Sequence, residues 1–423
     1  MVSVLTAVAG MVSAVIALQQ IYWWQVKEYR WDRWWSFVQY NGGGREFWPR
    51  ALRRPVVTWR TVVMGVVWVC VGITINTWWG WLAAAIAGPM MGVAVTSPFS
   101  FMGKEMLARR ARKIMAGSGI KVIGITGSYG KTSSKEMLAF LVEEKFRTVK
   151  TLRNENTEAG IARRIIRAVK PDSEILILEI GAYRRGEIAR VMKIAPLDIA
   201  WVTAIGNQHM DLFKSQENLE KAKFELVEGL KPEGVAVFNR MAGEENLIAW
   251  ARERNIKSVV YGAAGRESNE KGAAEIAKWL GMGDKEIEER LAVFRKDNLW
   301  PKTVTTPGGV TVIDETYNAN EQGFKEVVRY VGKNFPGRKY LVIPGIIELG
   351  EQTEAVHRRL AAEVKSWDGV WSTNKQVAGY LGGVGEENTD KLCRIIKATV
   401  KPGDVVVVVS RVPSKLKTAI WQL

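Results

Sequence analysis

The stretch Gly124-Ile125-Thr126-Gly127-Ser128-Tyr129-Gly130-Lys131-Thr132 decides how the fold is interpreted, because it joins two segments of opposite character. The apolar run Lys121–Thr126 predicts a strand, and the following segment Ser133–Leu138 predicts the start of a helix. Glycines let the backbone turn tightly with its N–H groups facing a phosphate, and a helix N-terminus adds positive potential. Lys131 can reach terminal phosphates and Thr132 can ligate Mg²⁺, so the stretch predicts a phosphate-binding loop.

The loop departs from the full P-loop pattern at its first glycine. That pattern requires a glycine at position 125, which is isoleucine in this chain. The Gly130-Lys131-Thr132 end does fit, and Gly127 precedes it. A glycine turn with a purely structural role is the alternative interpretation.

Outward from the loop, short β-branched runs alternate with amphipathic segments, which is typical of a mostly parallel sheet covered by helices. The predicted strands are Lys121–Thr126, Ile175–Ile180, Ile199–Ala204 and Val235–Phe238 in a first series, and Val310–Asp314, Tyr340–Ile343 and Val405–Val409 in a second. We therefore predict an α/β fold, with a parallel-sheet P-loop ATPase domain at residues 119–300. A smaller Rossmann-like α/β domain is predicted at residues 301–423.

The charge of the chain is concentrated before these strands. The sequence has 423 residues and a net charge of +16, which favours either nucleic acid or an anionic membrane surface as a partner. Residues 1–120 contain 13 of the 60 Lys+Arg, only 4 of the 44 Asp+Glu, and 11 of the 18 Trp. Because this basic charge lies beside apolar runs, it indicates membrane lipid as a partner and no nucleic acid.

Residues 1–118 are predicted to form a membrane segment with about three transmembrane helices, near residues 2–24, 61–79 and 82–102. Residues 2–26 and 61–103 contain no charged side chain, and about 20 apolar helical residues cross a bilayer. Arginines fill the connection after the first apolar run, and more basic residues follow residue 103, so both segments are expected in the cytoplasm. The chain is thus expected to be multi-pass and to face the cytoplasm. A cleaved signal peptide is the alternative interpretation of the first apolar stretch, although this stretch lacks the basic residues with which signal peptides begin.

Cysteine and histidine are scarce. Cys70 and Cys393 cannot build a disulfide framework, and their spacing excludes a structural zinc site. Any imidazole chemistry must use His209 or His357, and a structural role is expected for His357.

Several segments together resemble the Mur ligases, the amide-bond-forming enzymes of peptidoglycan precursor synthesis, and most closely the branch that adds D-alanyl-D-alanine. The resemblance covers roughly residues 120–423. The segments that carry it are Thr126–Thr132, Asn154–Gly160, Leu178–Ala182, Thr203–His209, Lys221–Glu225, Ile313–Asn320 and Glu348–Glu351, with His357 beyond.

The resemblance implies ATP and Mg²⁺ as cofactors. ATP would phosphorylate a substrate carboxylate, an amine would attack the acyl phosphate, and phosphate would leave. Charge accumulates on oxygens throughout, so the protein mainly has to place cations and hydrogen-bond donors in advance.

The resemblance also implies a set of site residues. Lys131, His209 and Lys223 would be catalytic; Thr132 and Glu179 would hold one Mg²⁺, and His209 with a carbamylated Lys223 a second. The nucleotide would contact Gly127, Ser128, Gly130, Lys131, Thr132, Ser133, Asn269, Asp314, Asn318 and Asn320, and the substrate would contact Asn156 and Thr157. The alternatives are a solvated strand-end acid at Glu179, a loop histidine at His209, an unmodified helical Lys223, and loop-capping asparagines at 318 and 320.

The chain departs from that branch in three places. A membrane segment precedes the loop where the usual enzyme has a domain that binds uridine diphosphate, so a lipid-linked acceptor is plausible. Residues 239–299 retain only Asn269 of an expected His-Asn-x-x-Asn turn, and Arg295 or Lys302 could replace an arginine that contacts ATP. The ending Val408–Arg411 matches the family's Lys-Gly-Ser-Arg only in part.

We therefore expect a membrane-anchored, ATP-dependent carboxylate-amine ligase of cell-envelope synthesis that adds an amino acid or a dipeptide such as D-Ala-D-Ala. Its expected partners are membrane lipid, a small-molecule or lipid-linked envelope precursor, and other envelope-synthesis proteins. A poly-γ-glutamate-type ligase and a non-catalytic nucleotide-binding membrane scaffold are the alternatives.

Overall fold

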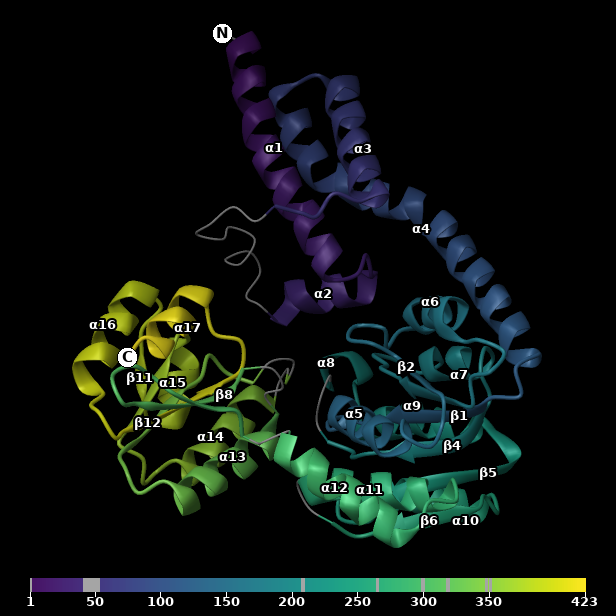
Figure 1. Ribbon diagram of the computed structural model, residues 1–423. Coiled ribbons are helices and arrows are strands. Elements are labelled where there is room, and N and C mark those ends of the chain that lie inside the picture. Colours follow the sequence, from purple (N-terminus) through teal and green to yellow (C-terminus); the bar gives the residue numbers. More distant parts are fainter. Residues whose placement is uncertain are drawn as a thin grey trace. The chain divides into compact units, whose positions relative to one another are not determined.

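A computed structural model of the chain describes residues 2–40, 54–206, 210–263, 266–297, 301–316, 320–346, 349 and 352–423. The chain divides into two compact units, Met1–Ala111 and Arg112–Leu423. The first unit is helical, and the second contains two β-sheets with their helices (Figure 1). The domain boundaries predicted at residues 118/119 and 300/301 stay predictions.

Among the described residues, the first unit contains α1 (Val2–Val26), α2 (Trp31–Tyr40), α3 (Trp59–Ile75) and most of α4 (Trp78–Ala116). Two of these described helices, α1 and α4, are long and apolar enough to cross a membrane, so the expectation of about three spans is wrong. Helix α3 ends where Asn76 adopts a left-handed conformation with φ of 40°. Its 17 residues extend about 25 Å at 1.5 Å each, short of the roughly 30 Å hydrocarbon core.

Helices α3 and α4 pack closely through glycines. A Cβ atom at Gly88 would lie 2.5 Å from Cα of Trp68, and one at Gly92 would lie 2.7 Å from Cα of Met64. Only glycine therefore allows the two backbones to approach this closely, as is common where helices pack in membranes.

The first sheet has six parallel strands in the order β2-β3-β1-β4-β5-β6. The strands are β1 (Lys121–Thr126), β2 (Thr148–Lys150), β3 (Ile175–Glu179), β4 (Leu197–Val202), β5 (Leu230–Asn239) and β6 (Ser258–Tyr261). The accompanying helices are α5 (Lys131–Val142), α6 (Glu158–Ala168), α7 (Glu187–Met192), α8 (Met210–Phe213), α9 (Gln216–Glu228), α10 (Glu245–Glu253), α11 (Arg266–Trp279) and α12 (Asp284–Asp297). The central strands β1 and β3 are buried almost throughout, as expected for strands covered on both faces.

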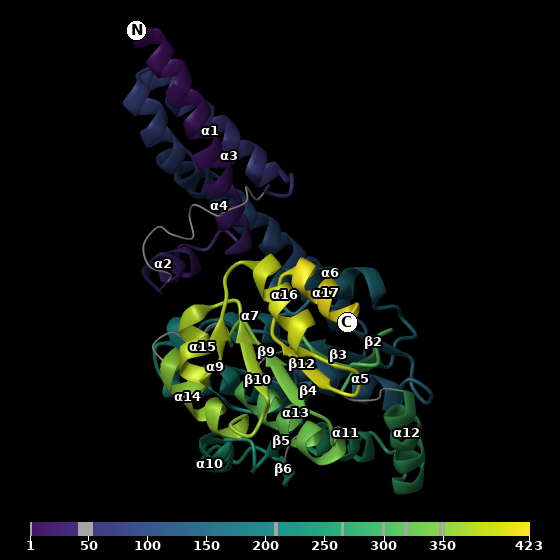
Figure 2. The ribbon, with the colours of Figure 1, turned by 90° about the vertical axis from the view of Figure 1, so that its left-hand side faces the viewer.

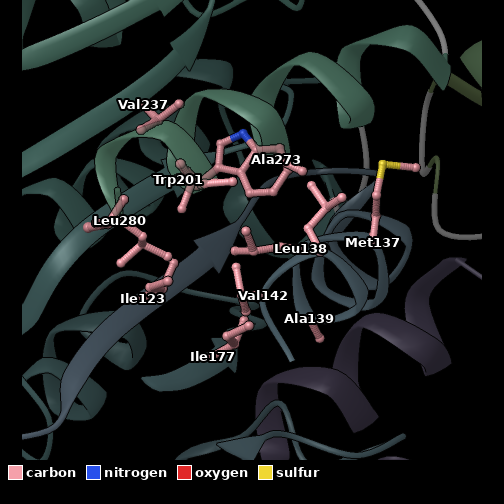
Figure 3. Close-up of a cluster of buried hydrophobic side chains, with 14 of the residues drawn as sticks. Ile123, Met137, Leu138, Ala139, Val142, Ile177, Trp201, Val237, Ala273 and Leu280 are labelled. Atoms are coloured by element: carbon pink, nitrogen blue, oxygen red, sulfur yellow. The ribbon is translucent and has the colours of Figure 1, made fainter. Parts of the chain in front are cut away.

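Trp201 of β4 is a central residue of the core under this sheet (Figure 3). Its side chain is fully buried, and its indole N–H donates to the hydroxyl of Tyr261 at 3.2 Å. Gly272 of α11 packs so closely on the indole ring that a side chain there would overlap the ring. The core thus fixes α11 against the sheet.

The second sheet has the order β11-β10-β9-β12-β8-β7, and only β7 runs antiparallel to its neighbour. The strands are β7 (Thr303–Thr305), β8 (Thr311–Glu315), β9 (Lys339–Val342), β10 (Gly369–Ser372), β11 (Val384–Gly385) and β12 (Val405–Val409). Its helices are α13 (Glu321–Asn334), α14 (Thr353–Glu363), α15 (Lys375–Leu381), α16 (Thr389–Thr399) and α17 (Ser414–Trp421). Strands β10, β9 and β12 lie side by side in Figure 2. The predicted α/β class is therefore confirmed.

We predict that Trp201→Ala lowers the free energy of unfolding of the α/β unit by about 3–5 kcal/mol, because it leaves a cavity beside Gly272. Guanidinium unfolding of the full chain in detergent, followed by circular dichroism, measures the change. Val293→Ala is the control, since that side chain is 47% exposed and its loss should cost under about 0.5 kcal/mol. Equal losses for the two variants would contradict the central position of Trp201.

Candidate active site

The loop between β1 and α5 has the backbone geometry that its glycines allow. Gly127 has φ of 154° and Gly130 has φ of 82°, both in the region that favours glycine. A side chain at Gly127 would also overlap the hydroxyl of Thr203. Gly130 is the N-cap of α5 and supplies no side-chain cap, so the first N–H groups of this helix are left for a ligand.

The loop is held in place by the segment that follows β4. The N–H of Ser128 donates to the carbonyl of Ala204 at 2.8 Å, and the hydroxyl of Thr203 donates to the carbonyl of Tyr129 at 2.6 Å. The hydroxyl of Ser128 exchanges hydrogen bonds with both the carbonyl and the N–H of Gly206. Ser128 was expected to contact the nucleotide, but its hydroxyl is used to hold the loop.

Lys131 lies folded over the loop and donates from Nζ to the carbonyls of Gly127 at 2.7 Å and Ser128 at 3.2 Å. Burial lowers the pKa of Lys131 to about 8, although the nearby carboxylate of Glu179 opposes the change. Its ammonium group has neutral carbonyls as hydrogen-bond partners, so a phosphate in the loop would supply the missing negative charge.

Thr132 and Glu179 meet beside the loop. The hydroxyl of Thr132 donates to Oε1 of Glu179 at 3.0 Å, and the N–H of Glu179 donates to the hydroxyl of Thr151 at 2.9 Å. Thr132 and Glu179 meet because β3 pairs in parallel with β1, which brings the carboxyl ends of both strands to the same edge of the sheet. Glu179 is 7% exposed, so it is not the solvated strand-end acid of the alternative interpretation.

The hydroxyl oxygen of Thr132 and Oε1 of Glu179 could together hold one Mg²⁺ ion whose other ligands are nucleotide phosphates and water. Magnesium commonly takes one or two protein oxygens and keeps phosphate and water ligands for the rest. In the described part of the chain, no group of three or more His, Cys, Asp or Glu side chains could hold a metal ion. A dedicated all-protein metal cage is therefore not seen among those residues.

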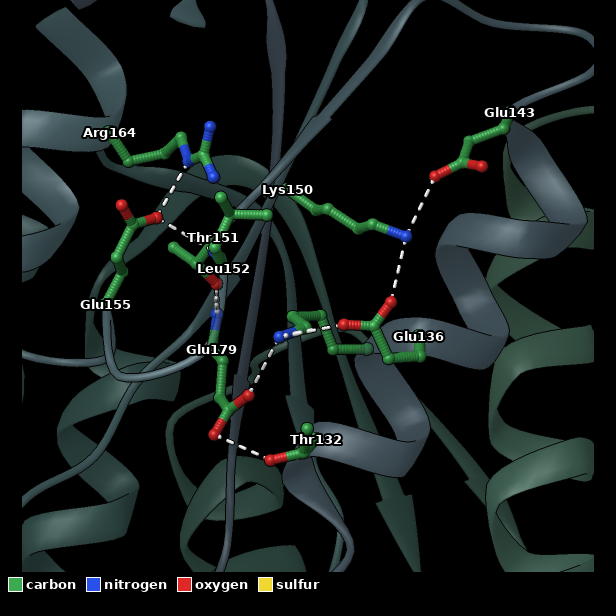
Figure 4. Close-up of polar contacts among 10 residues, drawn as sticks. Thr132, Glu136, Glu143, Lys150, Thr151, Leu152, Glu155, Arg164 and Glu179 are labelled. Carbon is green, nitrogen blue, oxygen red and sulfur yellow. Dashed lines mark hydrogen bonds and ion pairs between the residues drawn. The ribbon is translucent and has the colours of Figure 1, made fainter. Parts of the chain in front are cut away.

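Lys135, between the labelled Glu179 and Glu136 of Figure 4, is the main site residue that the sequence analysis missed. It is completely buried, and its Nζ atom lies 3.1 Å from Oε2 of Glu179. It follows Lys131 by one helical turn on α5, and this spacing is a signal that could have placed it at the site.

Lys223 of α9 is 3% exposed. Burial, together with repulsion from Lys131, lowers the pKa of Lys223 to about 7, although Glu187 and Glu225 oppose the change. An amine with this pKa is substantially uncharged at neutral pH, which is the state that reacts with carbon dioxide.

Glu225 fixes α7 against α9, a role that the sequence analysis did not assign. Its two carboxylate oxygens accept from the N–H groups of Gly186 at 2.6 Å and Ala189 at 3.1 Å. The carboxylate satisfies free N–H groups at the start of α7 and complements the helix dipole. Glu187, on the first turn of α7, is thereby kept near Lys223.

The structure brings Asn269 of α11 to the loop. The hydroxyl of Ser134 donates to Oδ1 of Asn269 at 2.9 Å, and a Cβ atom at Gly130 would lie 3.1 Å from the same oxygen. Ser133, the neighbouring residue on α5, is exposed. The position of Asn269 agrees with the expected nucleotide contact, although its role stays a prediction.

Asn156 and Thr157 lie beside the end of β3. The carbonyl of Asn156 accepts from the N–H of Gly181 at 2.9 Å. The hydroxyl of Thr157 accepts from the N–H of Gly160 at 3.3 Å and caps α6. The hydrogen bond of Asn156 uses its backbone carbonyl, so contact of its side chain with substrate stays a prediction. The hydroxyl of Thr157 caps a helix.

Asp314 and Asn320 make their described hydrogen bonds within the second α/β region. Asp314 accepts hydrogen bonds from the hydroxyl of Thr316 at 2.6 Å and from Nζ of Lys417 at 2.9 Å. Burial alone would raise the pKa of Asp314, but these hydrogen bonds hold it below its usual value. Asn320 accepts from the N–H of Gly323 at 2.9 Å and caps α13, which is the capping role of the alternative interpretation. Lys417 is a further residue that the sequence analysis missed.

Some predicted positions lie outside the described residues, namely His209, Asn318, Glu348, Gly350 and Glu351. His357 is fully buried, with Nε2 accepting from the N–H of Ile346 and Nδ1 bonded to the carbonyl of Thr353. These bonds agree with the structural role expected for it. Arg295 forms ion pairs with Glu270 and Glu288.

We predict that Lys223→Met stabilises the protein at pH 6.5 by about 1–3 kcal/mol, because a buried ammonium group is replaced by an apolar side chain. The unfolded lysine has a pKa near 10.5 and the folded one about 7, so the unfolded state binds more protons between these values. The penalty is therefore complete below pH 7 and is lost as the pH rises toward 10.5.

Thermal unfolding in bicarbonate-free buffer at pH 6.5 and pH 9.5 tests this, and the gain should fall by more than half at the higher pH. Lys221→Met is the matched control on α9, since its side chain is 42% exposed. A gain that does not change with pH would contradict the assignment to buried charge.

The Mur ligase middle domain family matches residues 125–287. The D-alanyl-D-alanine-adding ligase of Bacillus subtilis is 26% identical over 292 residues, covering 61% of this chain and 63% of that protein. That of Synechocystis is 28% identical over 335 residues, covering 67% of this chain and 70% of that protein. The chain thus spans less than two thirds of the length of the Bacillus relative.

Among solved structures, the MurF ligase from Thermotoga maritima in complex with ADP matches with a TM-score of 0.66 and 25% identity. The match covers 75% of this chain and 83% of that one. The ADP in that relative agrees with the expected ATP, and ATP with Mg²⁺ are the cofactors of this family. Residues 125–287 thus match a Mur ligase middle domain, and the chain is similar in sequence and in structure to Mur ligases that add D-alanyl-D-alanine.

Proposed function

We propose that the protein is an ATP- and Mg²⁺-dependent carboxylate-amine ligase that acts on a peptidoglycan precursor. The observation that supports this most is the glycine loop at the start of α5, with Lys131 over the loop and the Thr132–Glu179 pair beside it. A loop of this kind gathers cations and N–H donors where phosphate charge develops during transfer.

The loop N–H groups and Lys131 bind the β- and γ-phosphates of ATP. A carboxylate oxygen of the acceptor attacks the γ-phosphorus, and ADP leaves. Thr132 and Glu179 would hold Mg²⁺, which neutralises charge on the phosphate oxygens. The amine nitrogen then attacks the acyl carbon, its proton passes to a base, and phosphate leaves to give the amide.

Lys223 enters this reaction as a carbamate. Its depressed pKa leaves a neutral amine whose nitrogen bonds to the carbon of carbon dioxide with loss of one proton. The resulting anion would lie near the cationic Lys131 and so relieve the repulsion between two lysines. With His209 it would hold a second Mg²⁺, as the family resemblance implies.

The proposed amine is D-alanyl-D-alanine, which the names of the relatives specify for those proteins. The proposed acceptor is a precursor with a free peptide carboxylate, held either by a nucleotide or by a lipid. The helical unit of α1–α4 lies in the part of the chain before the match to the family, which supports a membrane-held acceptor.

Ligation is tested with full-length protein in detergent, ATP, Mg²⁺, D-Ala-D-Ala and either a UDP-linked or a lipid-linked precursor. We expect acceptor-dependent phosphate release, and Lys131→Ala should reduce it at least about 100-fold because the phosphates lose their principal cation. Lys170→Ala, at an exposed lysine, is the control. No phosphate release with either acceptor would refute the ligase, and glutamate replacing D-Ala-D-Ala as the better amine would favour the poly-γ-glutamate alternative.

We also propose that α1 and α4 anchor the protein to the membrane with the ligase on the cytoplasmic side. Large apolar side chains are exposed along the helices of the first unit. Examples are Val8, Met11, Val62, Val66, Ile86 and Phe99. In water such a surface would be unfavourable, whereas lipid covers it at no cost.

Carbonate washing of cell membranes tests the anchoring. The full chain should stay in the pellet, and a variant that lacks residues 1–103 should move to the soluble fraction and still bind ADP. If the full chain is washed off, or if the truncated variant pellets equally, the anchoring proposal is wrong.

A further inference from the structure

The two carboxylate oxygens of Glu179 have different partners, because one of them forms an ion pair with Lys135. Its Nζ atom is 3.1 Å from Oε2 of Glu179, and the hydroxyl of Thr132 is 3.0 Å from Oε1 (Figure 4). Lys135 is completely buried, so water cannot replace its partners. Oε2 is therefore engaged by an ammonium group, and Oε1 is the oxygen that faces the loop side.

A series of alternating charges holds Lys135 in this position. Its Nζ atom also lies 3.1 Å from Oε1 of Glu136, whose other oxygen lies 2.9 Å from Nζ of Lys150. Lys150 in turn lies 3.1 Å from Glu143. Burial opposes ionisation of Glu136, but hydrogen bonds from Lys150 and Lys135 keep its pKa below the usual value.

The series contains three carboxylates and two ammonium groups, in the order Glu179, Lys135, Glu136, Lys150 and Glu143. Lys135 is therefore balanced by Glu136 as well as by Glu179. Glu179 can bind a metal ion while Lys135 keeps Glu136 as a partner. A buried ammonium group without any partner would be strongly unfavourable.

The number of free carboxylate oxygens affects which metal ion is preferred. Mg²⁺ requires a nearly ideal octahedron with ligands at about 2.0–2.1 Å, whereas Ca²⁺ accepts six to eight oxygens and often binds a carboxylate through both. A glutamate with one oxygen engaged by an ammonium group can offer only the other. Such a glutamate suits Mg²⁺ and disfavours Ca²⁺.

We propose that Lys135 is a positioning residue that holds Glu179 in a one-oxygen binding mode and thereby makes the nucleotide site select Mg²⁺ over Ca²⁺. This inference rests on the proposed function, since it requires a metal–nucleotide complex at Thr132 and Glu179. It assigns Lys135 a role in metal selectivity in addition to its ion pairs within the fold.

Calorimetric titration of the full-length protein with ADP tests the proposal, in the presence of Mg²⁺, of Ca²⁺, or of neither. In the wild type Mg²⁺ should strengthen ADP binding more than Ca²⁺ does. Lys135→Met should shift the ratio of the two dissociation constants about tenfold toward Ca²⁺, because Glu179 can then bind through both oxygens. ADP binding without metal should stay the same, which a general loss of structure would not allow.

Two variants control for indirect effects. Lys135→Arg keeps a cation on Oε2 and should retain the preference of the wild type for Mg²⁺. Glu143→Gln changes the far end of the charge series and should leave the ratio unchanged. If Lys135→Met does not fold, Lys135→Met combined with Glu136→Gln also removes the second acid that pairs with Lys135 and gives the same measurement.

The outcomes separate this inference from the proposed function. A wild type whose ADP binding does not depend on either metal refutes the metal site itself. A wild type that prefers Mg²⁺, together with a folded Lys135→Met variant of unchanged preference, refutes only the role of Lys135. A shift as large in Glu143→Gln would also overturn it.

Discussion

The parallel pairing of β1 with β3 on one side and β4 on the other is the constraint on which the candidate site depends. It brings three chain segments to one edge of the sheet, namely the end of β3 with Glu179, the glycine loop after β1, and the segment Thr203–Gly206 after β4. The hydrogen bonds of Ser128 and Thr203 then fix the loop against the segment that follows β4. Without this strand order, Thr132 and Glu179 would not meet.

Buried positive charge is the second characteristic of the site. Burial lowers the pKa of Lys131, which lies over the loop, and that of Lys223, whose pKa is lowered also by repulsion from Lys131. Concentrating cations in a poorly solvated place costs stability in the free protein. The same arrangement suits a site that binds polyphosphate and stabilises charge that develops on phosphate oxygens.

The helical unit differs from the rest of the chain in where its apolar side chains lie. In the α/β unit the large aliphatic and aromatic residues are mostly enclosed between sheet and helices, whereas along α1, α3 and α4 many are exposed. Glycines at 88 and 92 bring α3 and α4 into close contact. Exposed apolar side chains and close glycine contacts are both common where helices pack in lipid, and the membrane anchoring that we propose for this unit rests on them.

The sequence by itself determined the α/β class, the central strands, the glycine loop and the candidate roles of Lys131, Thr132 and Glu179, because strand pattern, glycine conformation and motif spacing are local properties. It overestimated the number of spans, since α3 ends at Ile75, before the left-handed Asn76, whereas the predicted span continues to residue 79. Only the tertiary structure decided that Lys135 pairs with Glu179 and that Asn269 meets Ser134. The pairs formed by Lys135 and Asn269 join residues that are 44 and 135 positions apart, and they depend on strand order and helix packing.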